Sequence, residues 1–217
     1  MGAIDNISKG VSEKLGNRLD KTEEEKAVLN YGLFIIIHTS LSIVLTFIAG
    51  LVTGMAIEIM TITFSAAWLK RYSGGVHANT PNRCLLIGII VSLTLCFLYK
   101  TGMILLEDNM LLLILLIGII VSYIVLYYKC PVGSKNKPLK KESTRKKLRK
   151  KAFTLINLYS IAILAGYLIY KKQDIYILKD IISCMWLGLL LQISMLTKFG
   201  QKLIDVLDDM LGKLKIS

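Results

Sequence analysis

Apolar residues in this 217-residue chain are gathered into long runs, and polar or charged stretches separate one run from the next. A helix that crosses a lipid bilayer needs about 20 mostly apolar residues. Residues 31–69 are long enough for two such helices that fold back at the glycine-flanked turn 50–54. Four further runs each fit one helix, namely 84–99, 110–128, 152–170 and 175–197. The pattern therefore predicts an all-α, polytopic membrane protein with about six transmembrane helices.

These helices are expected to form a single domain, residues 1–217, with amphipathic ends and two polar loops. The parts are an N-terminal segment at 1–30, a transmembrane region at 31–197 with a polar loop at 70–84 and a basic loop at 129–151, and a tail at 198–217. The case for the second predicted span is the weakest of the six, because this run contains Glu58. Composition supports the membrane class, since 54% of the residues are hydrophobic.

Both ends of the chain carry apolar residues at helical spacing. The stripes consist of Ile4, Ile7, Val11, Leu15 and Leu19 near the N-terminus and of Leu203, Leu207, Met210 and Leu214 in the tail. Such amphipathic helices lie in the membrane interface or on a partner helix, or they pack onto the protein's own cytoplasmic face. The sequence leaves these alternatives open.

The distribution of Lys and Arg predicts the orientation in the membrane. The basic loop holds eleven of the 27 basic residues, and cytoplasmic loops are enriched in Lys and Arg. With six spans, this loop, the polar loop and both termini lie on the same side. We therefore expect a multi-pass cell-membrane protein with both termini in the cytoplasm, where cysteines stay reduced. The first thirty residues lack the apolar core of a cleavable signal peptide.

The polar loop gathers uncommon residue types in "RYSGGVHANTPNRC", residues 71–84. Thr80 followed by Pro81 is typical of a helix N-cap and the first helical residue, so the third span should begin at about Pro81. Cys84 then lies in the first turn or just beyond it. There the positive end of the helix dipole favours a thiolate.

His77 lies seven residues before Cys84. In a continuous helix the two residues would be about 10 Å apart along the axis, but Pro81 disfavours helix before it, and Gly74 and Gly75 allow a sharp bend. A loop that folds His77 back over the helix start would bring together a nucleophile and its general base. The alternatives are a cysteine that fills apolar space and a solvated surface histidine.

Other polar residues have open roles. Arg71 suits either pairing with a substrate carboxylate or the positive flank of a span. His38 and Glu58 are minor candidates because polar groups inside a span are often functional. The residues that could orient His77 are Ser73, Asn79 and Asn82.

The sequence predicts no metal site and no cofactor, because its Cys and His residues lack the paired spacing of zinc ligands. Nucleic acid is not an expected partner, since the basic loop has no interleaved aromatic residues. We expect that loop to contact the anionic headgroups of the lipid bilayer, and binding of an acidic peptide is the alternative. The residues that would bind such a peptide are Lys146, Lys147, Arg149 and Lys150.

The arrangement of Arg71, Gly74-Gly75, His77 and Cys84 resembles the signature of the accessory gene regulator B (AgrB) peptidases of Gram-positive bacteria. The resemblance extends to the amphipathic start, the position of the polar loop, the basic central segment and the total length. It implies a membrane cysteine endopeptidase of quorum sensing, with His77 and Cys84 as catalytic residues. It also implies homodimers and a partner, an AgrD-like precursor, which the enzyme cuts and helps to cyclise to a thiolactone or lactone autoinducer.

Two hypotheses from other classes remain. A membrane transporter or peptide exporter would work independently of Cys84, and His38 and Glu58 inside predicted spans suggest it. A scaffold would only dock a peptide through the basic loop. The sequence lacks the paired interrupted helices that many transporters have.

Overall fold

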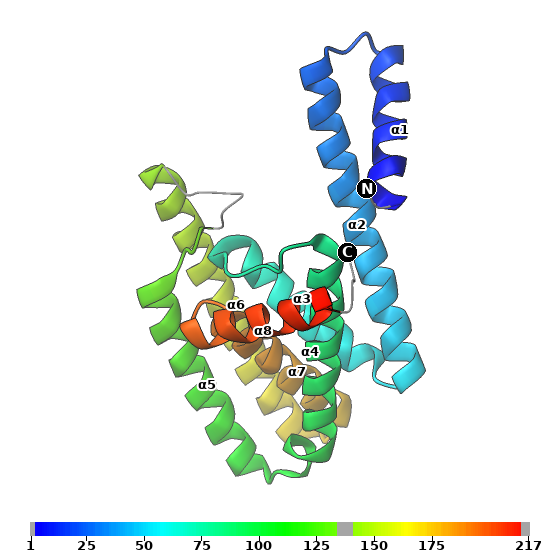
Figure 1. Ribbon diagram of the computed structural model, residues 1–217. Helices are drawn as coiled ribbons and strands as arrows, with labels where there is room; N and C mark the ends of the chain where they lie inside the picture. The colour runs from blue at the N-terminus through cyan, green and yellow to red at the C-terminus, as the bar shows by residue number, and fades with distance from the viewer. Residues whose placement is uncertain (1–2, 134–140, 214–217) are drawn as a thin grey trace.

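The structure is a computed structural model that describes residues 3–133 and 141–213, and the regular elements in these residues are helices (Figure 1). They are α1 (Ala3–Arg18), α2 (Glu23–Thr53), α3 (Ala56–Ser73), α4 (Pro81–Thr101), the short 3-10 helix η1 (Met103–Leu105), α5 (Asp108–Lys129), α6 (Glu142–Gln173), α7 (Tyr176–Ser194) and α8 (Lys198–Lys213). Within the described residues, five helices are long and apolar enough to cross a membrane, namely α2, α4 with η1, α5, α6 and α7. The predicted all-α, polytopic membrane protein is confirmed.

Helix α3 takes the place of the second predicted span and is not among the five helices that are long and apolar enough to cross a membrane. It carries Glu58 in its first turn and Lys70 and Arg71 in its last. It packs against α2, α4, α6 and α7, and its Ile59 and Ile62 side chains are fully buried. Because protein surrounds much of α3, the helix needs fewer apolar residues than one that faces lipid on most sides.

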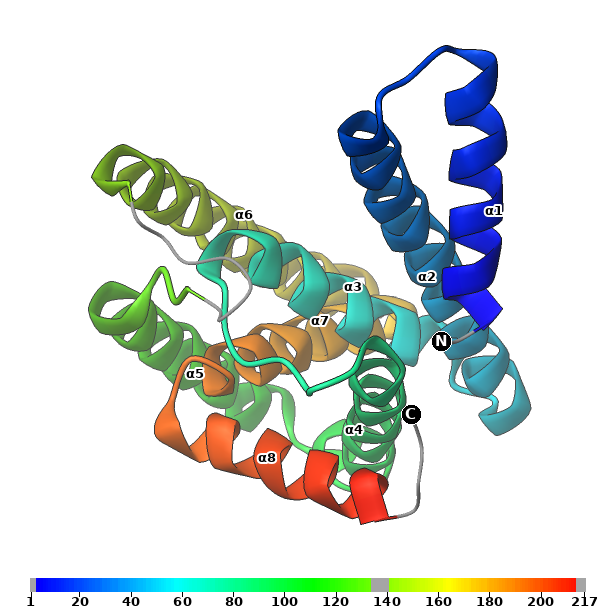
Figure 2. The same ribbon diagram turned by 45° about the horizontal axis from the view of Figure 1, so that its top comes forward.

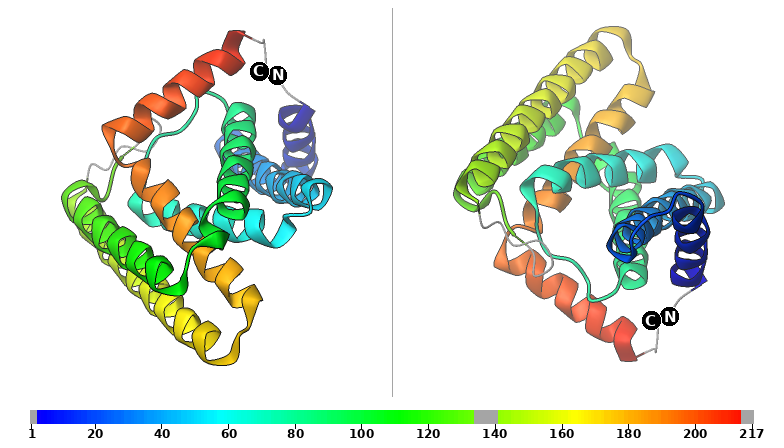
Figure 3. Two further views of the ribbon diagram at one scale, coloured as in Figure 1. Left: turned by 90° about the horizontal axis from the view of Figure 1, so that it is seen from below. Right: turned by 90° about the horizontal axis from the view of Figure 1, so that it is seen from above.

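The connections between helices gather at two ends of the bundle (Figures 1 and 3). One end, which we call the loop end, carries the α3–α4 connection at residues 74–80, the end of α5, the start of α6, and α8. The α2–α3, α4–α5 and α6–α7 connections lie at the opposite end. The polar loop, the start of the basic helix α6 and the tail thus share one end, as six alternating spans require. Which membrane face this end occupies stays a prediction.

Two helices extend into segments that were predicted to be separate. Helix α2 begins at Glu23 and runs through the predicted boundary at residue 31, because Thr22 and Glu25 form a reciprocal capping box. Helix α6 begins at Glu142, so residues 142–151 of the predicted basic loop are helical; their Glu, Lys, Arg and Leu residues favour helix. Residues 134–140 of that loop lie outside the described residues.

The amphipathic ends pack on the protein and still leave apolar residues exposed. Helix α1 lies antiparallel to α2 as a hairpin that extends beyond the bundle (Figure 1), with Ser8 and Ser12 buried. The exposed apolar side chains are Ile7, Val11, Leu15 and Leu19 on α1, and Phe199, Leu203, Val206 and Met210 on α8. Both helices therefore combine a face that packs on the protein with an exposed stripe suited to the bilayer interface. Leu214 lies outside the described residues.

Candidate active site

The start of α4 places Cys84 at the loop end. Thr80 caps the helix, since its hydroxyl accepts a hydrogen bond from the Arg83 N–H (3.3 Å), and Pro81 is the first helical residue. The Cys84 N–H donates to the Thr80 carbonyl oxygen (3.0 Å). The predicted helix start at Pro81 is confirmed, and the half-buried Cys84 lies in the first turn.

The glycine pair at the start of the loop has a backbone geometry that other residues rarely adopt. Gly74 has φ 73° and Gly75 has φ 130°. The Val132 N–H donates to the Ser73 carbonyl oxygen (2.9 Å), and a Cβ atom on Gly74 would overlap the Val132 carbonyl oxygen. The segment after α5 therefore presses against the loop, and only glycine permits this approach.

A glutamine from α7 forms hydrogen bonds with Ser73 and Gly74, at the start of the loop. The side chain of Gln192 is 2% exposed, and its Nε2 donates to the Ser73 hydroxyl (2.9 Å) and to the Gly74 carbonyl oxygen (2.8 Å). Gln192 was not among the residues that the sequence singled out. The available signal was an amide side chain inside a mostly apolar span.

The middle of the loop is held on both sides of His77. The Lys70 ammonium donates to the Val76 carbonyl oxygen (2.9 Å), one residue before His77. Two residues after it, the backbone N–H of Asn79 donates to the carboxylate of Asp208 on α8 (3.3 Å). Lys70 and Asp208, too, were not among the residues that the sequence singled out.

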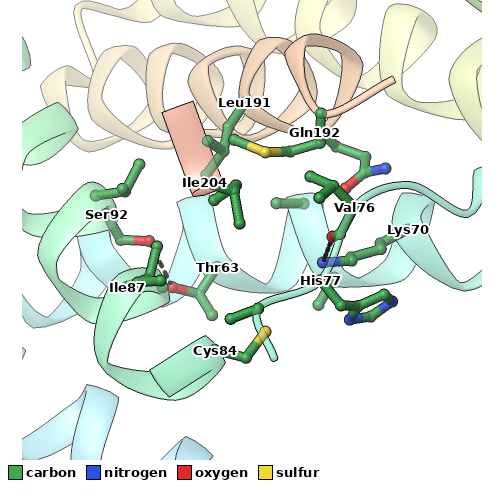
Figure 4. Close-up of a pocket in the computed structure, with 16 residues that line it drawn as sticks. Thr63, Lys70, Val76, His77, Cys84, Ile87, Ser92, Leu191, Gln192 and Ile204 are labelled. Atoms are coloured by element: carbon green, nitrogen blue, oxygen red, sulfur yellow. Dashed lines mark hydrogen bonds between the residues drawn. The ribbon is translucent and has the colours of Figure 1, made fainter. Parts of the chain in front are cut away.

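His77 and Cys84 line the same cavity, whose volume is about 170 Å³ (Figure 4). Helices α3, α4, α7 and α8 and the loop form its walls, and most of the lining is apolar. At its inner end the Thr63 hydroxyl donates to the Ser92 hydroxyl (3.2 Å). The lining residues are Thr63, Ala66, Ala67, Lys70, Val76, His77, Ala78, Cys84, Ile87, Gly88, Val91, Ser92, Leu191, Gln192, Met195 and Ile204.

The electrostatic surroundings favour a neutral imidazole at His77. Partial burial of the ring lowers the pKa of His77, and the positive charge of Lys70 lowers it further. The Lys70 ammonium also interacts with the charge of a Cys84 thiolate. No hydrogen bond joins His77 to Cys84 in the described part of the chain, but catalytic hydrogen bonds often form fully only with substrate bound. The arrangement can therefore supply a neutral base and a sulfur nucleophile to one cavity.

The other predicted candidates lie outside this cavity. Arg71 is exposed, with its guanidinium 5.9 Å from the centre of the Tyr72 ring. In the basic group at the start of α6, Lys146 pairs with Glu142 (2.9 Å), and the Arg149 guanidinium donates to the Tyr127 carbonyl oxygen (2.8 Å). Neither these two residues nor Lys147 and Lys150 line the cavity.

The residues that suggested a transporter have local partners. Glu58 forms an ion pair with Lys100 (2.5 Å), and His38 stacks on Phe34 one helical turn away (5.8 Å between ring centres). Neither lines the cavity.

The other cysteines are buried and free. Cys96 and Cys184 lie inside α4 and α7 and are fully buried. Cys130 follows α5 at the loop end, where burial raises the pKa of its thiol to about 11. Cys84 is therefore the accessible cysteine of the described residues, and it is the one that lines a cavity together with a histidine.

A family model described as accessory gene regulator B matches residues 8–196. The chain belongs to the AgrB family. An AgrB-like protein of Clostridium perfringens SM101 is 32% identical over 214 residues, which are 97% of this chain and 99% of the relative. An AgrB-like protein of Listeria monocytogenes EGD-e is 31% identical over 70% of this chain and 72% of the relative. No solved structure matches.

Membership in the AgrB family gives the biological setting. The chain is a membrane protein and a protease-like processing component of agr quorum sensing, and it works with an AgrD-like precursor. The relatives come from Clostridium and Listeria, both Gram-positive genera.

Proposed function

We propose that this AgrB-family protein is a membrane cysteine endopeptidase that cuts the C-terminal tail from an AgrD-like precursor and prepares the rest for cyclisation. The observation that carries the proposal is the shared cavity, which is lined by both His77 and Cys84. A loop held by contacts from α3, α7, α8 and the segment after α5 positions the histidine. Preorganisation of this kind is what nucleophilic catalysis requires.

The reaction proceeds through a thioester. His77 accepts the Cys84 thiol proton while the sulfur bonds to the scissile carbonyl carbon. When the C–N bond breaks, His77 returns that proton to the leaving amine, and the tail departs with a new N-terminus. The acyl group stays on Cys84. The thiol of an internal precursor cysteine then attacks the thioester, so that its sulfur replaces the Cys84 sulfur and its proton returns to Cys84.

Two features favour negative charge at the reacting atoms. Cys84 lies in the first turn of α4, at the positive end of the helix dipole. Lys70 lines the same cavity, and its ammonium interacts favourably with a Cys84 thiolate. It acts on His77 as well, because its ammonium disfavours the imidazolium and keeps the base neutral.

Substituting Lys70 by Gln tests this electrostatic role. The amide can still donate to the Val76 carbonyl oxygen, but the charge that lowers the pKa of His77 is lost. The His77 pKa should rise, so the acidic limb of the pH profile of kcat/KM should move to higher pH. Arg71→Gln is the matched control, because it removes an exposed charge one residue away. An unchanged acidic limb in Lys70→Gln would show that the charge of Lys70 does not set the pKa of the catalytic base.

The apolar cavity is suited to an apolar part of the precursor next to the scissile bond. Gly88 lines it, and a Cβ atom there would have no neighbour within 4 Å. Gly88→Leu should therefore extend an apolar side chain into the cavity and raise KM by about tenfold, because burial of one apolar side chain is worth about 1.5–3 kcal/mol. Gly32→Leu on α2 has the same open surroundings away from the cavity and should leave KM unchanged. An equal KM for both variants would contradict a substrate-binding role of the cavity.

The experiment that tests the proposed function uses the purified protein in lipid vesicles with a synthetic AgrD-like precursor. Mass spectrometry should detect the released tail with the wild type. If the protein moves precursor across the vesicle membrane without cutting it, the exporter hypothesis holds instead. Docking of the precursor tail by Lys146, Lys147, Arg149 and Lys150, homodimer formation and cytoplasmic termini stay predictions.

A further inference from the structure

Helix α8 lies beyond the part of the chain that the family model matches, which ends at residue 196. It nevertheless lies next to the active site. Figures 2 and 3 show α8 beside the α3–α4 connection and the start of α4, and its Ile204 lines the cavity with His77 and Cys84.

A buried carboxylate joins α8 to the loop. Asp208 is 2% exposed. Its Oδ2 accepts hydrogen bonds from the backbone N–H of Asn79 (3.3 Å) and from the Asn79 side-chain amide. Its Oδ1 lies 3.8 Å from an Arg83 guanidinium nitrogen. The Arg83 guanidinium also lies against Gly212, one helical turn further along α8.

Asn79 and Arg83 lie close in the sequence to the two residues proposed to react. Asn79 lies two residues after His77, and Arg83 directly precedes Cys84. One carboxylate therefore contacts both the loop that carries the base and the helix turn that carries the nucleophile. Burial of a carboxylate is costly unless hydrogen bonds and an opposite charge compensate it. The two contacts to Asn79 and the nearby Arg83 supply that compensation only when the loop and α4 are in this arrangement.

We propose that α8 is a built-in positioning element of the active site, and that Asp208 is the positioning residue that sets the place of His77 relative to Cys84. The inference rests on the proposed function. Asp208 does not touch the reacting atoms; it acts through Asn79 and Arg83. The loop has matching contacts on its other side, from Lys70 to Val76 and from Gln192 to Gly74. Asp208 completes the support on the side of α8.

Kinetics separate positioning from substrate binding. Asp208→Ala should lower kcat by at least about tenfold while KM changes less than about threefold, because small displacements of reacting groups cost up to about 100-fold in rate. Asp205→Ala and Asp209→Ala remove the same charge from exposed positions of α8 and should behave as the wild type. A kcat for Asp208→Ala equal to that of these controls would overturn the proposal, and so would a loss confined to KM.

A second variant approaches the contact from the loop, in case Asp208→Ala fails to fold. Asn79 is exposed, and Asn79→Ala removes its side-chain amide but keeps the backbone N–H donor. It should lower kcat by about threefold, less than Asp208→Ala does, and the double variant should be no slower than Asp208→Ala alone. Independent, additive losses would contradict a shared role.

Hydrogen–deuterium exchange tests the contact without any need for peptidase activity. In Asp208→Ala the backbone amides of residues 76–80 should exchange faster, while Asp205→Ala should match the wild type. If the wild type cuts no precursor but exchange rises as expected, the proposed function fails and the structural role of Asp208 stands. If exchange in residues 76–80 is unchanged, the positioning role of Asp208 is wrong, whatever the peptidase assay shows.

Discussion

Replacing either Cys84 or His77 by Ala is expected to reduce precursor cleavage by at least about 1,000-fold, because a nucleophile and its base act as one unit. Loss of the sulfur removes the atom that forms the acyl bond. Loss of the imidazole removes the acceptor of the thiol proton and the donor to the leaving amine. The double variant should be no slower than either single variant. Cleavage is measured as tail release by each purified variant in lipid vesicles.

Two substitutions serve as controls for this result. Cys130→Ala removes a cysteine at the same end of the bundle, but this thiol is buried and its pKa is raised to about 11. His38→Ala removes the other histidine of the chain, which lies on α2 outside the cavity. Both variants should keep most of the activity. If cleavage survives in Cys84→Ala and is lost in Cys130→Ala, the assignment of the nucleophile is wrong.

Gly74→Ala is expected to lower kcat by at least about 100-fold through the geometry of the loop. The added methyl group would overlap the Val132 carbonyl oxygen, and the residue would have to keep φ at 73°. The loop must therefore move away from the segment after α5, and His77 moves with it. The kinetics of tail release and the thermal unfolding temperature in detergent are the measurements.

Gly54→Ala is the matched control for backbone strain. Gly54 also has positive φ (68°), but it ends α2 at the opposite end of the bundle, and a Cβ atom there would have no neighbour within 4 Å. Both substitutions should lower the unfolding temperature, since a left-handed conformation costs a non-glycine residue about 1–2 kcal/mol. Only Gly74→Ala should lose catalysis. Equal kcat values in the two variants would show that the close approach to Val132 is unimportant.

The features that the sequence predicted are those set by neighbouring residues. Thr80 and Pro81 define a helix start through a cap and a fixed φ, so the position of Cys84 in the first turn of α4 could be deduced. The adjacent glycines indicated a bend between α3 and α4. Apolar runs of bilayer length located the long helices. Each of these signals is contained within a few residues or one helix.

The features that the sequence did not predict depend on contacts between distant segments. Lys70, Gln192 and Asp208 support the loop from α3, α7 and α8, and no local pattern connects them. The interior position of α3 could not be read from its composition, because neighbouring helices decide whether it faces lipid. The helical start of α6 was missed because a dense group of charges is typical of both exposed helices and loops.

The central claim is that Cys84 holds the acyl group as a thioester long enough for a second nucleophile to take it. The most direct measurement is mass spectrometry of the intact protein after incubation with a precursor whose internal cysteine is replaced by Ala. We predict that the tail is released and that the rest accumulates as an adduct on Cys84, sensitive to hydroxylamine and absent from Cys84→Ala. Release of the free linear acid with no detectable adduct, even at the shortest times, would contradict this account.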